Sequence, residues 1–204
     1  MTGWRLALLA TLLALMLIAG RAGALHVNEG STGDGPATGH HWRMDRARST
    51  LTFATVAAGE PVRGSFTDWQ AAVVFNPARP SAARIAVTVP VVSIRTDMTD
   101  ADALLATSDF FERARFPMAR FVSTSVRPRG GSRFDVTGIL TVNGQRRTVV
   151  LPVNVAIRGG HARATGQLTV DRRWFSVGRR AWSDIGMLQA GVVINFTLVA
   201  DRIP

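Results

Sequence analysis

Apolar and polar side chains alternate with a period of two over most of the chain from Trp42 onward. In the segment 84–89, the apolar residues Ile85, Val87 and Val89 fall on one face and the residues between them on the other. A strand places successive side chains on opposite sides, so this pattern is typical of strands with one buried and one solvated face. The sequence therefore predicts a fold built mainly from half-buried strands.

Turn-forming residues divide this alternating part into about nine runs. Asn143-Gly144, a pair that favours a tight hairpin, lies between two of them. Strands are expected near 50–57, 62–68, 71–76, 84–96, 119–126, 133–142, 147–158, 162–171 and 190–200. Many strands without interleaved helices favour a closed antiparallel barrel or a sandwich. An eight-stranded barrel can enclose one small ligand.

One segment departs from the period of two. Between Met98 and Ser108, the residues Ala101, Leu104 and Leu105 recur at helical spacing. Pro117 follows and prevents a long continuation. We therefore expect one short helix in an otherwise all-β chain.

The first residues form a pattern of their own. A single positive charge at Arg5 precedes fifteen uncharged, mostly apolar residues and then Ala22-Gly23-Ala24. This order predicts a secretory signal peptide over 1–24, cleaved after Ala24, and a periplasmic or secreted protein. The alternative is an uncleaved membrane anchor, although the apolar run is shorter than a spanning helix needs. Residues 25–40 are rich in Gly, Ser, Thr and Asp and are expected to be flexible.

Composition narrows the classes of site that the chain can carry. It has no Cys, which excludes a disulfide scaffold, a thiolate metal site and a cysteine nucleophile. The formal net charge is +10, and removal of residues 1–24 takes away two arginines and no acid, which leaves +8. A basic balance fits nucleic acid, a membrane surface or an anionic ligand equally well. His40 and His41 lack a third ligand at suitable spacing, so we interpret them as a solvated pair and expect no metal site.

Several short motifs follow one another in a fixed order along the chain. They are Trp42-Arg-Met-Asp45, Ser49-Thr-Leu-Thr-Phe53, Gly64-Ser-Phe66, Ser93-Ile-Arg-Thr96, Asp102-Ala-Leu104, Asp109-Phe-Phe111, Phe116-Pro117, Phe121-Val-Ser-Thr124, Gly138-Ile-Leu-Thr-Val-Asn-Gly144, and Asp171-Arg172 with Phe175 and Gly178. Each motif alone is weak, but their order and spacing are specific, and together they resemble the YceI-like family of exported polyisoprenoid-binding proteins. Ser176 departs from the Gly that many members carry there.

The resemblance implies an elongated, eight-stranded, antiparallel lipocalin-like barrel with a short helical insert over residues 41–204. It implies an apolar interior that holds a polyprenyl lipid, an isoprenoid quinone or a similar amphiphile. It carries over no catalytic residues and no cofactor, since the lipid would be a ligand. Transient contact with a membrane surface and a homodimer are both left open.

The alternating apolar positions are the candidates for contact with such a tail. They are Phe53, Ile85, Val87, Val89, Phe134, Val136, Leu140, Leu151, Val153, Leu168, Val170, Val192, Ile194, Phe196 and Leu198. Periodicity predicts that these residues point inward. It does not separate the lining of a cavity from a filled core.

Arginines and tryptophans late in the chain are the candidates for a lipid head group. Arginine binds phosphate in a bidentate manner, so Arg172, Arg173, Arg179 and Arg180, with Trp174 and Trp182, are candidates for a rim at the barrel mouth that holds such a group. The interpretation we favour for the arginines is an ordinary solvated surface. Phe110, Phe111 and Phe116 form either a hydrophobic plug under the insert or part of a portal.

Three other classes of function fit the sequence less well. A lipocalin-like enzyme acting on a hydrophobic substrate would need grouped acid–base residues, whereas the aspartates are scattered and His161 stands alone. A small outer-membrane barrel would carry aromatic girdles, but the chain has no Tyr and ends Asp-Arg-Ile-Pro. For nucleic acid there is no aromatic binding platform, and export argues against it.

Overall fold

The computed structural model describes residues 39–97 and 99–204, so the signal peptide and most of the segment 25–40 lie outside the described residues. The strands are β1 (His40–Ala57), β2 (Glu60–Phe66), β3 (Gln70–Phe75), β4 (Arg84–Pro90), β5 (Ile94–Thr96), β6 (Met118–Pro128), β7 (Arg133–Val142), β8 (Gln145–Arg158), β9 (His161–Asp171) and β10 (Gly191–Arg202). The helices are α1 (Thr99–Leu105) and the short 3₁₀ turns η1 (Pro80–Ala82), η2 (Val91–Ser93), η3 (Arg172–Phe175) and η4 (Arg180–Ser183). In this described part, no helix has both the length and the apolarity that a membrane crossing requires.

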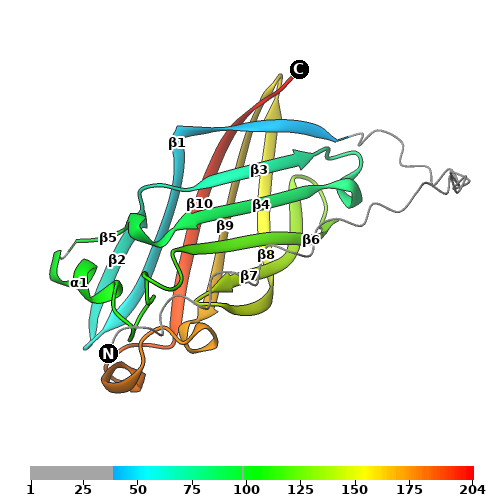
Figure 1. The fold of residues 1–204 in the computed structure, drawn as a ribbon. Coiled ribbons are helices and arrows are strands. Elements are labelled where there is room, and N and C mark those ends of the chain that lie inside the picture. Colours follow the sequence, from blue (N-terminus) through cyan, green and yellow to red (C-terminus); the bar gives the residue numbers. More distant parts are fainter. Residues whose placement is uncertain (1–38, 98) are drawn as a thin grey trace, which may run out of the picture. The chain divides into compact units, whose positions relative to one another are not determined.

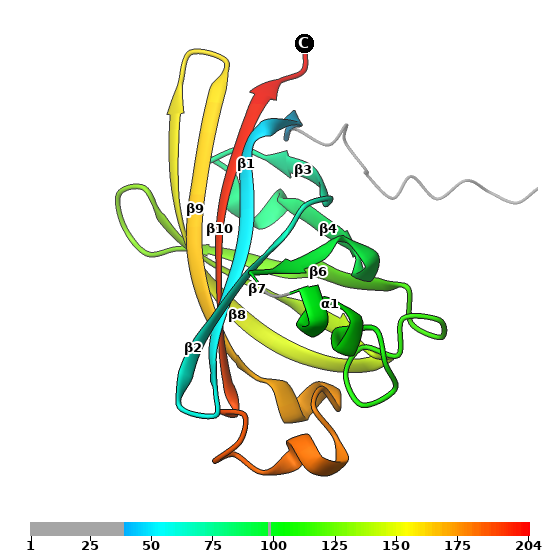
Figure 2. The ribbon, with the colours of Figure 1, turned by 90° about the vertical axis from the view of Figure 1, so that its left-hand side faces the viewer.

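Eight of the strands close into an antiparallel barrel (Figures 1 and 2). The order runs β1, β10, β9, β8, β7, β6, β4 and β3, and β3 pairs again with β1. The closing pair β1–β10 extends from Trp42 opposite Arg202 to Ala54 opposite Val193. The predicted eight-stranded antiparallel barrel is therefore confirmed.

Strand β1 bends sharply (Figure 1), and two different strands, β3 and β2, pair with successive parts of it. Its first residues, from His40 to Arg43, pair with β3, whereas its second half pairs with β2. Between these halves, the register with β10 shifts between Asp45 and Thr50. This irregularity hides the alternation, which explains why the sequence indicated a strand only from residue 50.

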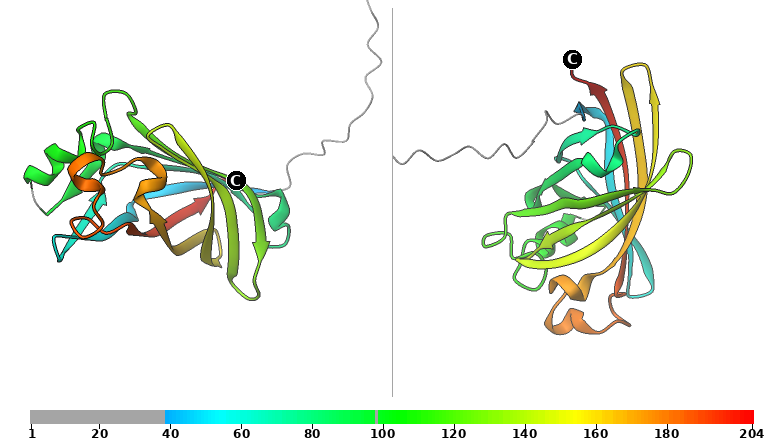
Figure 3. Two further views of the ribbon diagram at one scale, coloured as in Figure 1. Left: turned by 90° about the horizontal axis from the view of Figure 1, so that it is seen from below. Right: turned by 90° about the vertical axis from the view of Figure 1, so that its right-hand side faces the viewer.

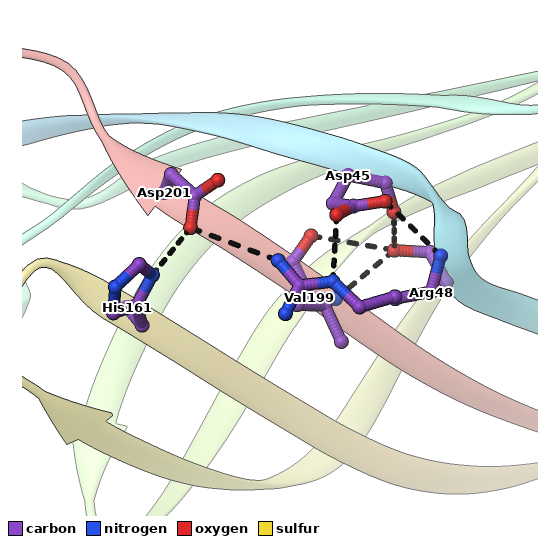
Figure 4. Close-up of polar contacts among 6 residues, drawn as sticks. Asp45, Arg48, His161, Val199 and Asp201 are labelled. Atoms are coloured by element: carbon purple, nitrogen blue, oxygen red, sulfur yellow. Dashed lines mark hydrogen bonds and ion pairs between the residues drawn. The ribbon is translucent and has the colours of Figure 1, made fainter.

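The bend in β1 is held by side chains at the irregularity (Figure 4). Ser49 Oγ donates to the carbonyl of Asp45 at 2.6 Å and accepts from the backbone N–H of Val199 at 3.0 Å. Arg48 Nε donates to the Asp45 carboxylate at 2.6 Å. This hydrogen bond lowers the pKa of Asp45 below its ordinary value. Ser49 is buried, so its hydroxyl needs partners within the protein. Its hydrogen bonds to Asp45 of β1 and Val199 of β10 supply them and join the two strands at the bend.

His161 does not stand alone. It lies opposite Asp201 in the β9–β10 ladder, and its Nδ1 is 2.7 Å from Asp201 Oδ1 (Figure 4). Arg48 approaches the same carboxylate at 4.0 Å. All three side chains are solvent-exposed, so the group is a surface charge cluster.

The run expected as one strand over 84–96 is divided after Pro90. The chain turns through η2, and β5 then pairs with β2 outside the closed barrel. Ser93 Oγ lies 2.7 Å from the carbonyl of Pro90 and 2.9 Å from that of Asp68, which fixes this turn. The helix expected over 98–108 is present but shorter, as α1.

Residues 172–190, here called the cap, join β9 to β10 and contain η3 and η4. They lie at the end of the barrel that is remote from the C-terminus (Figures 1 and 2). Helix α1 and residues 106–117, here called the insert, lie beside the cap (Figure 3). The two segments touch where Phe110 and Trp182 pack with ring centroids 5.5 Å apart.

Candidate ligand-binding cavity

The barrel encloses a cavity of about 590 Å³ that is lined almost entirely by apolar side chains. A packed core that includes Trp42, Phe75 and Phe134 lies at its end near the C-terminus. The indole Nε1 of Trp42 donates to the carbonyl of Phe75 at 2.9 Å, and Phe75 packs edge-on against Phe134. The opposite end is walled by the insert and the cap.

All fifteen inward candidates from the sequence line this cavity. They come from β1, β4, β7, β8, β9 and β10, and Val192, Ile194, Phe196 and Leu198 show the regular spacing that puts alternate residues inside. The period of two therefore located the barrel wall correctly. The structure also separates the two alternatives that periodicity left open, because the interior holds space as well as a packed core.

The end wall contains residues that the sequence did not single out as lining. The cap contributes Phe175, Val177 and Leu188, and the insert contributes Leu104 and Leu105. The helical spacing in 98–108 indicated an apolar face for α1, so that contact was detectable. The cap has no repeating pattern, and no signal in the sequence marked which of its residues turn inward.

The three insert phenylalanines divide between two environments. Phe110 is buried and lines the cavity together with Phe111, whereas Phe116 lies against Gly144 at the β7–β8 turn. The buried Asn143 of that turn donates from Nδ2 to the carbonyl of Phe110 at 2.5 Å. Phe110 and Phe111 therefore form part of the end wall, and Phe116 anchors the insert to the barrel.

Three phenyl rings of the wall lie against glycines of the neighbouring strand. A Cβ atom added at Gly64, Gly138 or Gly166 would lie 2.3–2.4 Å from the ring of, respectively, Phe53, Phe121 or Phe196, which is too close for both to fit. All three rings line the cavity. Because each ring occupies the space of a missing side chain, it lies close to the wall and leaves more of the interior open.

Arg172 does not belong to a solvent-facing rim, which corrects its assignment as a head-group ligand. Only 2% of the residue is exposed. Its five N–H donors are all used by backbone carbonyls of the cap, at 2.6–3.0 Å: those of Val177, Gly178, Trp182, Leu188 and Gln189. No donor remains for a phosphate. Burial lowers the pKa of this guanidinium from its ordinary value.

The other head-group candidates are at the surface of the cap. Arg173 pairs with Asp171, with Nη2 2.5 Å from Oδ2, and this hydrogen bonding lowers the pKa of Asp171. Trp174 is 46% exposed and does not line the cavity, whereas Trp182 is half-buried and does. The predicted group is therefore divided. Arg172, with all its donors used inside the cap, and Trp182 line the cavity, whereas the other four residues lie at the surface.

Arg179 and Arg180 connect the cap to the insert. Arg180 Nη1 is 2.5 Å from Asp109 Oδ1, and Arg179 Nη2 is 3.3 Å from Glu112 Oε2 and also contacts the carbonyl of Ser108. The backbone N–H of Arg179 donates to the carbonyl of Asp109 at 2.8 Å. We call these contacts the cap–insert seam. The seam residues do not themselves line the cavity, but their sequence neighbours Phe110 in the insert and Trp182 in the cap do, so the seam lies beside the end wall.

Comparison with known proteins gives a consistent result over the barrel. The family model described as the YceI-like domain matches residues 42–200. Protein YceI of Escherichia coli O6:H1 is 35% identical over 96 residues, which are 47% of this chain and 50% of the relative. A UPF0312 protein of Pseudomonas savastanoi pv. phaseolicola is 36% identical over 90 residues, or 44% and 47%. In these matches the chain spans about half the length of its curated relatives.

Solved structures match over a larger share. BcnA of Burkholderia cenocepacia superposes with a TM-score of 0.74 at 33% identity, covering 76% of this chain and 98% of that protein. A polyisoprenoid-binding domain from Saccharophagus degradans shares the fold with a TM-score of 0.63 at 14% identity, covering 79% and 98%. The family model extends over nearly the whole closed barrel, and the chain belongs to the YceI-like family.

Proposed function

We propose that this protein is an exported carrier that holds the tail of an isoprenoid lipid, either a polyprenyl chain or an isoprenoid quinone, inside the barrel. The observation that carries the proposal is the apolar cavity of about 590 Å³. The solved Saccharophagus degradans domain with the same fold is described as polyisoprenoid-binding, which supports the same class of ligand. Family and fold favour a binding protein over an enzyme.

The size and chemistry of the cavity set what it can hold. A carbon atom in a packed chain occupies on the order of 25 Å³, so a five-carbon isoprene unit needs roughly 125 Å³. The 590 Å³ cavity therefore has room for a tail of a few such units. Each buried methylene-sized group contributes about 0.8 kcal/mol. Affinity would then come from the tail, and few polar contacts to the head group would be needed.

The direct test is to identify what the protein carries. The protein is purified without detergent from the cells that make it, extracted with organic solvent, and the extract is analysed by mass spectrometry. A prenyl lipid in stoichiometric amount is the expected result. An empty extract, together with no binding of an added isoprenoid quinone or polyprenyl phosphate, would overturn the proposal.

A pair of variants on one strand tests whether the tail lies inside. Ala164 lines the cavity, whereas the adjacent Arg163 is exposed on the outer face of β9. Ala164→Trp puts an indole into the cavity and is expected to reduce prenyl-lipid binding at least roughly tenfold, because the indole occupies space in which methylene groups of the tail would otherwise be buried. Arg163→Trp places the same side chain outside and should bind as the unmodified protein does. Equal binding by the two variants, measured by ligand titration, would contradict an interior site.

A further inference from the structure

The cap is apolar on two sides. Its inner residues Phe175 and Leu188 are buried against the cavity. On the same segment, Trp174, Ile185 and Met187 are 46%, 57% and 46% exposed. Large apolar side chains held in water at the closed end of a lipid-sized cavity suggest an interaction surface.

These exposed side chains belong to a segment that is firmly attached. Arg172 holds the cap through five backbone carbonyls. The carbonyl of Met187 accepts from the N–H of Ala58 at 2.7 Å, and the N–H of Gln189 donates to Val56 at 2.9 Å, so the cap is also bound to the β1–β2 hairpin. The outward position of the apolar groups is therefore built into the fold.

Exposed arginines that can bind phosphate belong to the same segment, the cap. The side chains of Arg179 and Arg180 are 44% and 74% exposed although both take part in the cap–insert seam. Exposed ion pairs of this kind contribute little stability, so their carboxylate partners can be exchanged for other anions. Arginine binds phosphate at least as well as carboxylate, through two parallel hydrogen bonds.

Exposed tryptophan and aliphatic side chains together with exposed arginines on one segment are the combination found in proteins that lie on lipid headgroups. The formal net charge of +10, or +8 without residues 1–24, adds a long-range attraction to an anionic surface. The chemistry of the cap therefore fits an anionic bilayer better than it fits a neutral protein partner.

We propose that the outer side of the cap docks on an anionic lipid bilayer. Trp174, Ile185 and Met187 enter the interface. Arg179 and Arg180 exchange Asp109 and Glu112 for lipid phosphates, which loosens the cap–insert seam at the end wall of the cavity. A tail can then pass between bilayer and barrel without crossing water. The passage of a tail rests on the proposed function, whereas the docking itself does not.

The test measures vesicle binding by co-sedimentation with two sets of vesicles, pure phosphatidylcholine and phosphatidylcholine mixed with phosphatidylglycerol. Variants and controls carry the same N-terminus, so differences among them report on the altered residues. Trp174→Ser/Ile185→Ser/Met187→Ser is expected to weaken binding to the mixed vesicles by tenfold or more, as the apolar anchor is lost. Its control, Val150→Ser/Ile203→Ser, removes exposed apolar groups elsewhere and should bind normally.

The arginine contribution has a charge-matched control. Arg179→Ser/Arg180→Ser should lose roughly tenfold in binding to the mixed vesicles and little on pure phosphatidylcholine. Arg133→Ser/Arg158→Ser removes the same charge at exposed sites outside the cap and insert, and should lose clearly less. Equal losses in the two pairs would overturn the role of the seam. No preference for the mixed vesicles, or equal binding by the apolar variant and its control, would overturn the docking surface.

A measurement without membranes separates this proposal from the proposed function. Binding of farnesol in solution is titrated for the same variants, and the cap variants should bind it as the unmodified protein does. If farnesol and longer prenyl lipids fail to bind while the vesicle results hold, the carrier function is wrong and the docking surface stands. If they bind while the cap variants and their controls sediment alike, the docking surface is wrong and the carrier function stands.

Discussion

At the scale of single residues, the shape of the cavity depends on where side chains are missing. The rings of Phe53, Phe121 and Phe196 fill the space above glycines of the next strand and lie close to the barrel wall. A side chain at any of those glycines would clash with the ring that lies above it. Such a pair therefore controls both wall packing and the width of the interior.

Gly166→Ala tests this arrangement. The new Cβ would lie 2.4 Å from the Phe196 ring and 2.6 Å from the carbonyl oxygen of Pro152, so ring and backbone must both shift. We expect a loss of about 1–3 kcal/mol in the free energy of unfolding, measured by urea denaturation, and weaker lipid binding. Gly160→Ala is the control, because nothing lies within 4 Å of its added Cβ, and it should change stability by less than about 0.5 kcal/mol.

Two adjacent arginines show where a local sequence pattern fails to predict side-chain direction. The alternating pattern identified inward residues on six of the eight barrel strands, because a strand fixes the direction of each side chain, but it singled out none on β3 or β6. Arg172 and Arg173 are identical neighbours in the sequence, yet one is buried and the other exposed. Which of two adjacent arginines turns inward is decided by the path of the cap, and no local pattern encodes that path.

At the scale of elements, the fold of the cap is organised around the side chain of Arg172. The guanidinium of Arg172 gathers carbonyls from Val177 to Gln189 that would otherwise be buried without donors. A lysine has three donors on a single nitrogen and cannot reach five carbonyls arranged around a planar group. The cap should therefore depend on arginine specifically.

Arg172→Lys is expected to lower the free energy of unfolding by about 2–4 kcal/mol, since several buried carbonyls lose their partners. The amides of the cap should also exchange faster with deuterium in hydrogen-exchange mass spectrometry. Arg173→Lys is the matched control one position away, where the side chain is 55% exposed and pairs only with Asp171. It should change stability by less than about 1 kcal/mol. Equal effects of the two changes would contradict the role given to Arg172.

Element boundaries were predicted well where strands are regular and poorly where they bend. The run at 133–142 coincides with β7, because nothing interrupts its alternation. Strand β1 begins ten residues before the expected start at residue 50, since the irregularity after Asp45 breaks the period. The run at 84–96 is divided because Pro90 ends β4 and the chain turns through η2.

At the scale of the whole molecule, the cavity links stability to its contents. An apolar cavity without a ligand forgoes contacts that a lipid would supply, so a bound tail adds to the free energy of unfolding. A ligand at a hundred times its Kd contributes about 2.7 kcal/mol. For a domain of this size that corresponds to a rise in Tm of roughly 5–10 °C.

Removal of the lipid is therefore expected to lower the Tm by that amount. The measurement is calorimetry of the purified protein before and after delipidation on a hydrophobic resin, and after a prenyl lipid is added back. Recovery of the Tm on adding the lipid, but not on adding a short alcohol of the same polarity, would identify the cavity as the cause. An unchanged Tm throughout would contradict a filled interior.

The closed barrel itself followed from the family resemblance more than from the alternation. Strands with one buried face give the same period of two in a sandwich and in a barrel. The difference lies in whether the first and last strands pair, and that pairing joins residues as distant as Ser49 and Val199, which are 150 positions apart. Local sequence patterns do not predict a contact between residues so far apart in the chain.

The closing pair between β1 and β10 has a consequence for how the chain acquires its structure. Strand β1 is made first and β10 last, so neither β1 nor β9 has its β10 neighbour until almost all of the polypeptide has been synthesised. Until then both present open edges, and exposed edges readily pair with other chains. Closure must also wait for a contact of very long sequence separation, which makes it a slow step. A chaperone that shields β-strand edges during this interval would protect the protein at its most vulnerable stage.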